Sequence, residues 1–149
     1  MKTLSDTATR QKIVQRLQSV RPESQRRWGK MSSHQMICHL KDSLRNLMGE
    51  RPTSKHSTFP LLKWGALWVP IPWPHGFPAK PELDQQVGGS KPVEFQNDLR
   101  ELLALLDRFT AESPRPTFAP HPTFGVMSHK EHMRCGYLHI DHHLRQFGS

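Results

Sequence analysis

The sequence predicts an all-α protein, a four-helix bundle built from a single domain that spans residues 1–149. Apolar residues recur every three or four positions in four long segments, which is the spacing of one face of a helix. No segment shows a convincing alternation of apolar and polar residues, which a half-buried strand requires. A segment rich in proline and tryptophan separates the second and third long helices, so the predicted bundle has one long crossover.

The first helix is predicted to begin near Ser5 or Asp6 and to end before Pro22, because proline cannot continue it. Its apolar face consists of Ile13, Val14, Leu17 and Val20. The net charge of the chain is +8, and residues 1–30 hold eight lysines and arginines against two acids. A basic first helix could contact phosphates or an acidic partner, but an ordinary solvated helix face explains the charge as well.

The second helix has the clearest start in the chain. Ser32 and Gln35 are three residues apart, as in a capping box, where each side chain accepts a hydrogen bond from the other residue's backbone N–H. The apolar face that follows consists of Met36, Ile37, Leu40, Leu44, Leu47 and Met48. Gly49 and Pro52 are predicted to close this helix.

The crossover covers residues 52–92 and contains eight prolines. Its large aromatic residues are Trp64, Trp68, Trp73 and Phe77. Leu61 to Val69 has room for one short helix, and the prolines that follow forbid its continuation. Because the aromatic side chains have apolar area to bury, we expect Trp64 to Phe77 to pack over one end of the bundle as a wall or lid of the site described below.

The third long helix is predicted from about Pro92 to Ala111, and the last from Ser128 through Phe147. Ser128 and Glu131 have the spacing of a second capping box. The inward residues of the third helix are Phe95, Leu99, Leu102, Leu103, Leu106 and Phe109. Those of the last helix are Met133, Tyr137, Ile140, Leu144 and Phe147.

Five of the ten histidines lie in the last 21 residues. His139 and His143 are four residues apart, so on a helix they lie one turn apart on the same face. Two imidazoles in this arrangement can bind one metal ion, and with a third ligand the ion keeps an open position for chemistry. The pair continues a stripe that includes His132 and Gly136. We expect Gly136 to leave space beside His139, and His142 to face solvent.

The second helix offers two candidates for the third ligand, His34 and His39. Each lies about 100–120° from the centre of the apolar face, on opposite flanks, so spacing does not choose between them. His34 lies in the first turn, where a neutral ligand is acceptable and an imidazolium is not. His39 lies mid-helix, where a rigid backbone would hold it better. An ordinary boundary histidine is the alternative interpretation of either.

The two cysteines, Cys38 and Cys135, are too few for a disulfide framework and predict a reduced, cytoplasmic protein. Pairs such as Cys38 with His34, or Cys135 with His132, lack an evident acid to orient the histidine for nucleophilic chemistry. No signal peptide is evident. The most apolar stretch, residues 64–73, is too short and too rich in proline to span a membrane.

Two segments, residues 31–40 and 139–146, are shared with a known superfamily, and three further motifs are shared with one of its subgroups, so that the five together cover nearly the whole chain. They are Met-Ser-Ser-His-Gln-Met-Ile-Cys-His-Leu at residues 31–40, His-Ile-Asp-His-His-Leu-Arg-Gln at residues 139–146, Arg26-Arg27-Trp28, Pro72-Trp73-Pro74 and His121-Pro122-Thr123-Phe124-Gly125. With them the chain resembles the DinB/YfiT superfamily, bacterial four-helix bundles with a three-histidine metal site. It is most similar to a subgroup of about this length that has no settled reaction.

The resemblance implies that His39, His139 and His143 are the metal ligands, which resolves the tie between His34 and His39. Zinc is the default ion, and imidazole also suits nickel, iron and copper. Characterised relatives include metal-dependent S-transferases that use low-molecular-weight thiols, and an isomerase. Common members read His-Arg-Gly-Gln after the last ligand, whereas here Leu144-Arg145-Gln146 follows. This departure keeps the ligands and affects only a substrate group contacted there.

Two functional hypotheses follow. The favoured one is a metal-dependent enzyme, a thiol S-transferase or a hydrolase-like protein, which acts on a small molecule by activating a bound thiol or water. His132 is the candidate for proton transfer, against the alternative of a boundary histidine. The second hypothesis is a non-catalytic bundle whose basic first helix binds nucleic acid or an acidic partner; no recognisable DNA-reading motif supports it. A homodimer, and a former enzyme that keeps a structural ion, are left open.

Overall fold

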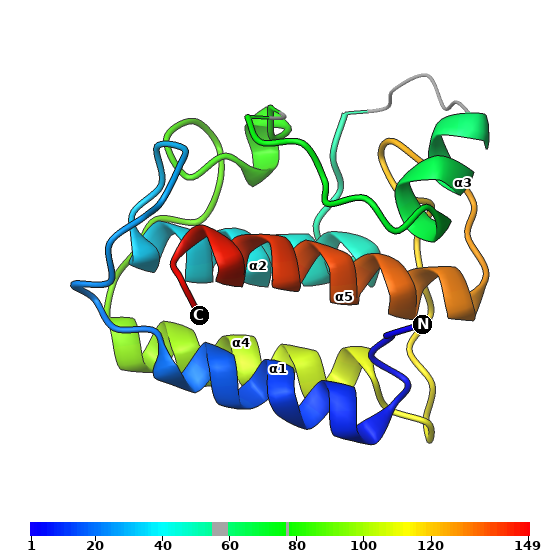
Figure 1. The fold of residues 1–149 in the computed structure, drawn as a ribbon, viewed down its shortest axis with the longest axis horizontal. Helices are drawn as coiled ribbons and strands as arrows, with labels where there is room; N and C mark the ends of the chain where they lie inside the picture. The colour runs from blue at the N-terminus through cyan, green and yellow to red at the C-terminus, as the bar shows by residue number, and fades with distance from the viewer. Residues whose placement is uncertain (55–59, 77) are drawn as a thin grey trace.

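The computed structural model describes residues 1–54, 60–76 and 78–149 (Figure 1). Four α-helices are long: α1 (Thr7–Ser19), α2 (Ser33–Leu47), α4 (Phe95–Phe109) and α5 (His129–Gln146). Two elements are short, the α-helix α3 (Pro60–Trp68) and the 3-10 helix η1 (Pro81–Leu83). The all-α prediction is confirmed for the described residues, which contain no strand and one isolated bridge, between His121 and Gly125.

Local sequence sets the helix starts. The Ser32 hydroxyl accepts a hydrogen bond of 3.1 Å from the Gln35 N–H, and the Gln35 side chain accepts one of 2.9 Å from the Ser32 N–H. Ser128 and Glu131 form the same capping box at the start of α5. Helix α4 begins slightly later than predicted, because the Glu94 carboxylate caps it by accepting from two backbone N–H groups.

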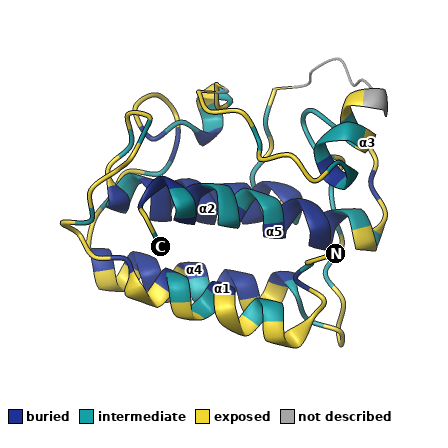
Figure 2. Ribbon diagram, viewed as in Figure 1, coloured by how far each residue is buried: buried dark blue, intermediate teal, exposed yellow. Residues whose placement is uncertain are grey.

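Each of the four long helices packs against two of the others. Helices α2 and α5 form one layer and α1 and α4 the other, with contacts of α2 to α4 and of α1 to α5 joining the layers (Figure 1). The segment between α2 and α4 lies over the α2/α5 layer, where α3 contacts α5 and η1 contacts α2. Helix α2 is therefore buried over most of its length, whereas α1 and α4 expose their outer faces (Figure 2).

The core between the layers is mainly aliphatic. Its fully buried side chains include Leu4, Ile13, Leu17, Met36, Ile37, Leu40, Leu102, Leu106, Phe109, Met133 and Ile140. On α4, Leu103 was predicted to face inward, but it is only partly buried. Leu105, which was not predicted to face inward, is buried instead.

The expectation for Gly136 is wrong. A Cβ atom at this position would lie 3.0 Å from Leu4 Cδ1 and 3.0 Å from Phe109 Cε1. The missing side chain therefore lets the side chains of Leu4 and Phe109 pack against the backbone of α5, and the space beside the glycine belongs to the core instead of to His139.

The proline-rich segment differs in part from its prediction. Trp64 is 63% exposed, so this tryptophan does not wall a cavity. Trp68 and Trp73 are half-buried and pack against the core, and Trp73 Nε1–H donates to the Ala66 carbonyl at 2.8 Å. Phe77 lies outside the described residues. Within residues 1–54, 60–76 and 78–149, no helix combines the length and apolar character that crossing a bilayer requires.

Candidate metal centre

Three histidines point at one another where α2 and α5 pack together. The Nε2 atom of His139 lies 3.1 Å from Nε2 of His39 and 3.2 Å from Nε2 of His143. One ring nitrogen from each of the three lies within 4.8 Å of the other two. The structure thus brings together the three residues that the family resemblance implies, and we call them the histidine cluster.

The orientation of His39 is determined by a backbone carbonyl. Its Nδ1 atom lies 2.8 Å from the carbonyl oxygen of Leu83, at the end of η1. Because a carbonyl oxygen only accepts hydrogen bonds, Nδ1 carries the proton and donates it. The Nε2 atom of the neutral ring then presents a lone pair to the cluster.

The loop that carries this carbonyl is attached to α2 by Asp42, which is fully buried. Its carboxylate accepts hydrogen bonds from Gln85 Nε2 at 2.9 Å and from the backbone N–H and hydroxyl of Ser90, both at 2.7 Å. Asp42 lies one turn beyond His39 on the same helix. The contacts therefore hold the loop at a constant position relative to His39.

His143 is oriented by a side-chain amide. Its Nδ1 atom lies 2.9 Å from Gln146 Oε1, and Gln146 Nε2 donates to the Trp28 carbonyl at 2.8 Å. Since the amide NH₂ group faces the Trp28 carbonyl, the amide oxygen faces His143, and Nδ1 of His143 must be the donor. The Nε2 atom of His143 then also presents a lone pair to the cluster.

Protein atoms alone do not satisfy the centre of this cluster. If Nδ1 carries the proton of a neutral His139, both short Nε2 contacts bring two lone pairs together; if Nε2 carries it, the single N–H group can serve only one of the two lone pairs that face it. A cation at the centre would attract all three nitrogens. Nitrogens bound to tetrahedral zinc at about 2.0–2.1 Å are about 3.3–3.4 Å apart, close to the 3.1 and 3.2 Å seen here. The donor set fits a divalent metal ion.

The protonation of the cluster also suits a ligand role. Burial lowers the pKa of His139 and of His143 well below the usual histidine value, and the neighbouring imidazoles lower both further. Burial likewise lowers the pKa of His39. Metal ions bind the neutral form of histidine, so these rings are in the binding form at neutral pH.

Aromatic rings surround one side of the cluster. The Trp73 ring centre lies 6.1 Å from that of His139, and the His142 ring centre lies 5.2 Å from that of His143. Trp28 stacks on His75 with ring centres 3.9 Å apart and meets His142 edge-on at 5.9 Å. His142 was expected to face solvent, but it is half-buried among these rings.

The family of the chain follows from its sequence as a whole. A family model described as a protein of unknown function, DUF1569, matches residues 3–149. The chain belongs to the DUF1569 family. No curated protein and no solved structure matches it. The family description names no activity, so a function has to be argued from the arrangement of the residues.

His34, the other candidate third ligand, lies on the opposite flank of α2. Its Nε2 atom lies 2.7 Å from Asp98 Oδ2 on α4, and Lys41 Nζ lies 2.5 Å from Asp98 Oδ1. Asp98 also accepts a hydrogen bond from the Val93 N–H at 3.2 Å. We call His34, Lys41 and Asp98 the Asp98 cluster. Because α2 packs between α4 and α5, one flank faces each cluster.

The cysteines do not form a nucleophilic site. Cys38 lies near His34 and Asp98, so the structure supplies the orienting acid that the sequence did not reveal. Burial, however, raises the pKa of the Cys38 thiol to about 11, and that of Cys135 to about 12. Both thiols stay protonated at neutral pH, which makes them poor nucleophiles.

His132 does not belong to the histidine cluster. Its Nδ1 atom lies 3.0 Å from the Ser128 carbonyl oxygen and its Nε2 atom 3.3 Å from that of Ala119, and its ring stacks on Phe118 with centres 4.3 Å apart. Burial lowers its pKa. These contacts describe a buried boundary histidine, and a role in proton transfer stays a prediction.

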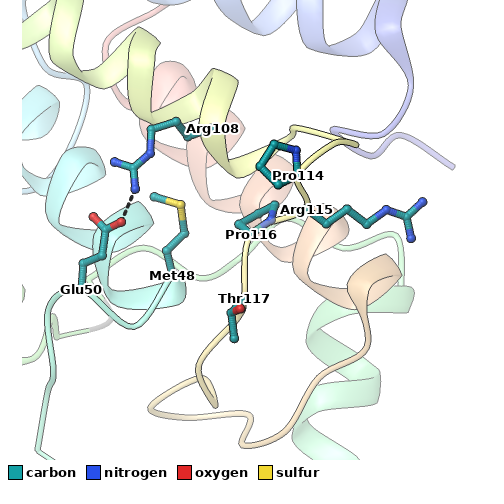
Figure 3. Close-up of a pocket in the computed structure, with 7 residues that line it drawn as sticks. All are labelled: Met48, Glu50, Arg108, Pro114, Arg115, Pro116 and Thr117. Carbon is teal, nitrogen blue, oxygen red and sulfur yellow. Dashed lines mark hydrogen bonds and ion pairs between the residues drawn. The ribbon is translucent and has the colours of Figure 1, made fainter.

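A surface pocket lies where the end of α2 approaches α4 (Figure 3). It is lined by Met48, Glu50, Arg108, Pro114, Arg115, Pro116 and Thr117. An ion pair between Arg108 and Glu50 borders it, and the Arg115 side chain points away from that pair. No member of the histidine cluster lines this pocket, and it offers none of the metal-binding groups found there.

Sequence reasoning missed the groups that orient the histidines. Gln146 is three residues after His143 on the same helix, so helical spacing could have identified it as a neighbour. The Leu83 carbonyl and the Trp28 carbonyl could not have been identified, because backbone atoms of distant loops leave no mark in the sequence.

Proposed function

We propose that this DUF1569 chain is a metal-dependent enzyme of DinB/YfiT type, in which His39, His139 and His143 hold a divalent ion, with zinc as the first choice. One observation carries the proposal: three Nε2 atoms face one another, and carbonyl-type acceptors hold the Nδ1–H groups of His39 and His143 outside the cluster. The DinB/YfiT assignment is supported by the shared motifs and by ligands that come from the second and the last long helix.

The chain's own residues would hold and orient the site. The Leu83 carbonyl and the Gln146 amide keep the lone pairs of His39 and His143 directed inward, which is the usual role of outer partners of metal-bound histidines. The half-buried Trp73 ring, whose centre lies 6.1 Å from that of His139, would limit the access of water on that side. When bound, the ion would supply a Lewis acid that lowers the pKa of a thiol or water molecule.

The reaction we propose is thiol transfer or hydrolysis on a small molecule, with a low-molecular-weight thiol as the favoured co-substrate. Neutral imidazoles do not offset the charge of an ion, and no carboxylate belongs to the histidine cluster. An ion in such a site keeps its full positive charge, which favours activation of a thiol or of water.

The alternative, binding of nucleic acid or an acidic partner through α1, gains no support from the contacts of its arginines. Arg16 donates to the Asp141 carboxylate at 2.6 Å and to the Ser149 carbonyl at 2.8 Å. Arg10 donates to the Leu4 carbonyl at 3.2 Å. Both arginines therefore have partners within the chain, and their contacts favour a structural role for this helix face.

The test is a screen for activity. Zinc-loaded protein would be assayed with small thiols and electrophiles, and separately with hydrolysable esters, beside the His143→Ala and His132→Ala variants. We expect turnover that the His143→Ala variant lacks, and a loss with His132→Ala would support its role in proton transfer. Equal turnover of the wild type and His143→Ala, or none with zinc, nickel, iron or copper, would contradict an enzymatic role.

A further inference from the structure

Four aromatic rings from three separate segments gather on one side of the histidine cluster. Trp73 lies against His139, and His142 lies against His143, with ring centres 6.1 and 5.2 Å apart. The Trp73 and His142 centres are themselves 6.4 Å apart. Beyond His142 lie the stacked rings of Trp28 and His75, whose centres are 5.9 and 6.0 Å from that of His142.

These rings differ from the hydrophobic core in their exposure. The core side chains are largely aliphatic and fully buried, whereas Trp28, Trp73 and His142 are half-buried and His75 is exposed. Aromatic surface that stays in contact with solvent next to convergent polar groups is typical of a ligand-binding site, where aromatic walls surround a few polar groups.

Hydrogen bonds fix the Trp73 ring and the backbone at Trp28. Trp73 Nε1–H donates to the Ala66 carbonyl of α3 at 2.8 Å, and the Trp28 carbonyl accepts from Gln146 Nε2 at 2.8 Å. Gln146 is also the residue that orients His143. Gln146 thus links the backbone at Trp28 to the histidine cluster, and α3 fixes the Trp73 ring separately, so a ligand would meet a preorganised surface.

We propose that Trp73 and His142 bind a planar aromatic group of the substrate, placed directly beside the metal ion, with the Trp28–His75 stack closing the far side of His142. The inference rests on the proposed function, because it assigns the substrate class of the same site. Ring stacking favours a planar aromatic group over an aliphatic group of equal size, since the aromatic quadrupoles add to the area that both groups bury.

Three probes with the same metal-binding head test the proposal. Benzohydroxamic acid carries a planar ring, cyclohexanecarbohydroxamic acid carries a ring of similar size that is not planar, and acetohydroxamic acid carries only a methyl group. Zinc affinity would be measured first, by competition with a coloured chelator. The affinity of each hydroxamate for zinc-loaded protein would then be measured by calorimetry, in the wild type and in His142→Ala, Trp73→Leu and Trp64→Ala.

We expect the wild type to bind benzohydroxamate roughly three- to tenfold more tightly than the cyclohexane compound, which is the range that aromatic pairing gives. His142→Ala and Trp73→Leu should reduce this preference to within about twofold. Trp64→Ala is the control, because Trp64 is exposed on α3 and belongs to no ring pair of the site. His142 is half-exposed, so its variant is expected to fold even if Trp73→Leu does not.

The measured affinities can contradict the aromatic substrate, the metal centre, or both. Equal affinity for the two ring compounds in the wild type, or a preference that persists in both site variants, would overturn the aromatic substrate and leave the metal centre standing. A wild-type protein that binds no zinc would overturn the proposed function and this inference together. The zinc titration, made before any hydroxamate is added, separates the two failures.

Discussion

Helix α2 carries two buried polar clusters on opposite flanks, and they differ in how their hydrogen bonds are satisfied. In the Asp98 cluster, Lys41 and His34 donate to the two carboxylate oxygens of Asp98, so each oxygen of this buried carboxylate has a hydrogen-bond donor within the chain. In the histidine cluster, three Nε2 atoms meet, and no acid among the residues that the structure describes joins them. Because unsatisfied buried groups are costly, the first arrangement is explained by stability, and the second is one that a cation from outside the chain would complete.

The comparison predicts that only one flank of α2 binds metal. His139→Ala removes a ligand of the histidine cluster, and we expect zinc affinity to fall roughly 1,000-fold, since structural zinc sites are worth about 10–16 kcal/mol shared among their ligands. His34→Ala is the matched control on the same helix as His39, and it should change zinc affinity by less than about threefold. Competition titration of untagged protein measures both. Comparable losses in the two variants would contradict the comparison.

The unfolding free energy should depend on the Asp98 cluster more than on the histidine cluster, the reverse of the zinc affinity. Asp98→Ala leaves Lys41, whose side chain is 5% exposed, with only the more exposed Glu101 carboxylate at 2.6 Å, so we expect a loss of about 3 kcal/mol of unfolding free energy, the lower end of what breaking a buried ion pair costs. In metal-free protein, His139→Ala should change the unfolding free energy by less than about 1 kcal/mol. Urea unfolding monitored by circular dichroism compares the two. A larger loss for His139→Ala than for Asp98→Ala would be evidence against the assigned roles.

Removing Gln146, which orients His143, should weaken zinc binding less than removing one of the three histidines. Gln146→Ala removes the acceptor of the His143 Nδ1–H group, and loss of such a partner typically weakens metal binding about 10- to 100-fold. Gln146→Glu keeps an acceptor oxygen for His143 but loses the donor to the Trp28 carbonyl, so a zinc affinity above that of Gln146→Ala would assign the effect to the acceptor of the Nδ1–H group. If Gln146→Ala keeps its affinity, the amide does not orient His143.

The Asp98 cluster also predicts a modest dependence of stability on acid pH. Burial alone would raise the pKa of Asp98, but hydrogen bonds from Lys41 and His34 outweigh burial and lower it to about 2. A carboxyl whose pKa is lowered on folding stabilises the protein fully above its ordinary value of 3.8. This contribution is lost as the pH falls from about 4 towards 2.

Urea unfolding at a series of pH values from 5 to 2.5 measures this loss, with Asp98→Asn as the control. The variant has no charge at this position, so its unfolding free energy should fall less steeply between pH 5 and pH 2.5. If the unfolding free energy falls equally steeply in both proteins, other carboxyl groups control acid unfolding.

Part of this comparison was predictable from the sequence. The capping boxes at Ser32 and Ser128 depend on residues three positions apart, so local spacing predicted where α2 and α5 begin. The His139 and His143 pair followed from the same helical arithmetic. Helical spacing could not choose between His34 and His39, because both flank the apolar face of α2. The two flanks differ only because α2 packs between α4 and α5, which gives each flank a different neighbour.

What escaped prediction depends on contacts between distant segments. The Leu83 carbonyl reaches His39 across 44 residues, and Asp98 reaches His34 across 64, so neither contact has a local signature. Gly136 was misread because its neighbours, Leu4 and Phe109, come from other parts of the chain. Trp64 was expected to be buried on composition alone, whereas its place on α3 leaves it exposed.

The most direct test of the metal centre is X-ray absorption at the zinc edge, on untagged protein loaded with one equivalent of zinc. We predict three nitrogen ligands of imidazole type at about 2.0–2.1 Å and no sulfur. A sulfur ligand at about 2.3 Å would instead place the ion beside Cys38, on the flank of α2 that we regard as structural. That result, or protein that retains no zinc, would contradict the assignment of His39, His139 and His143.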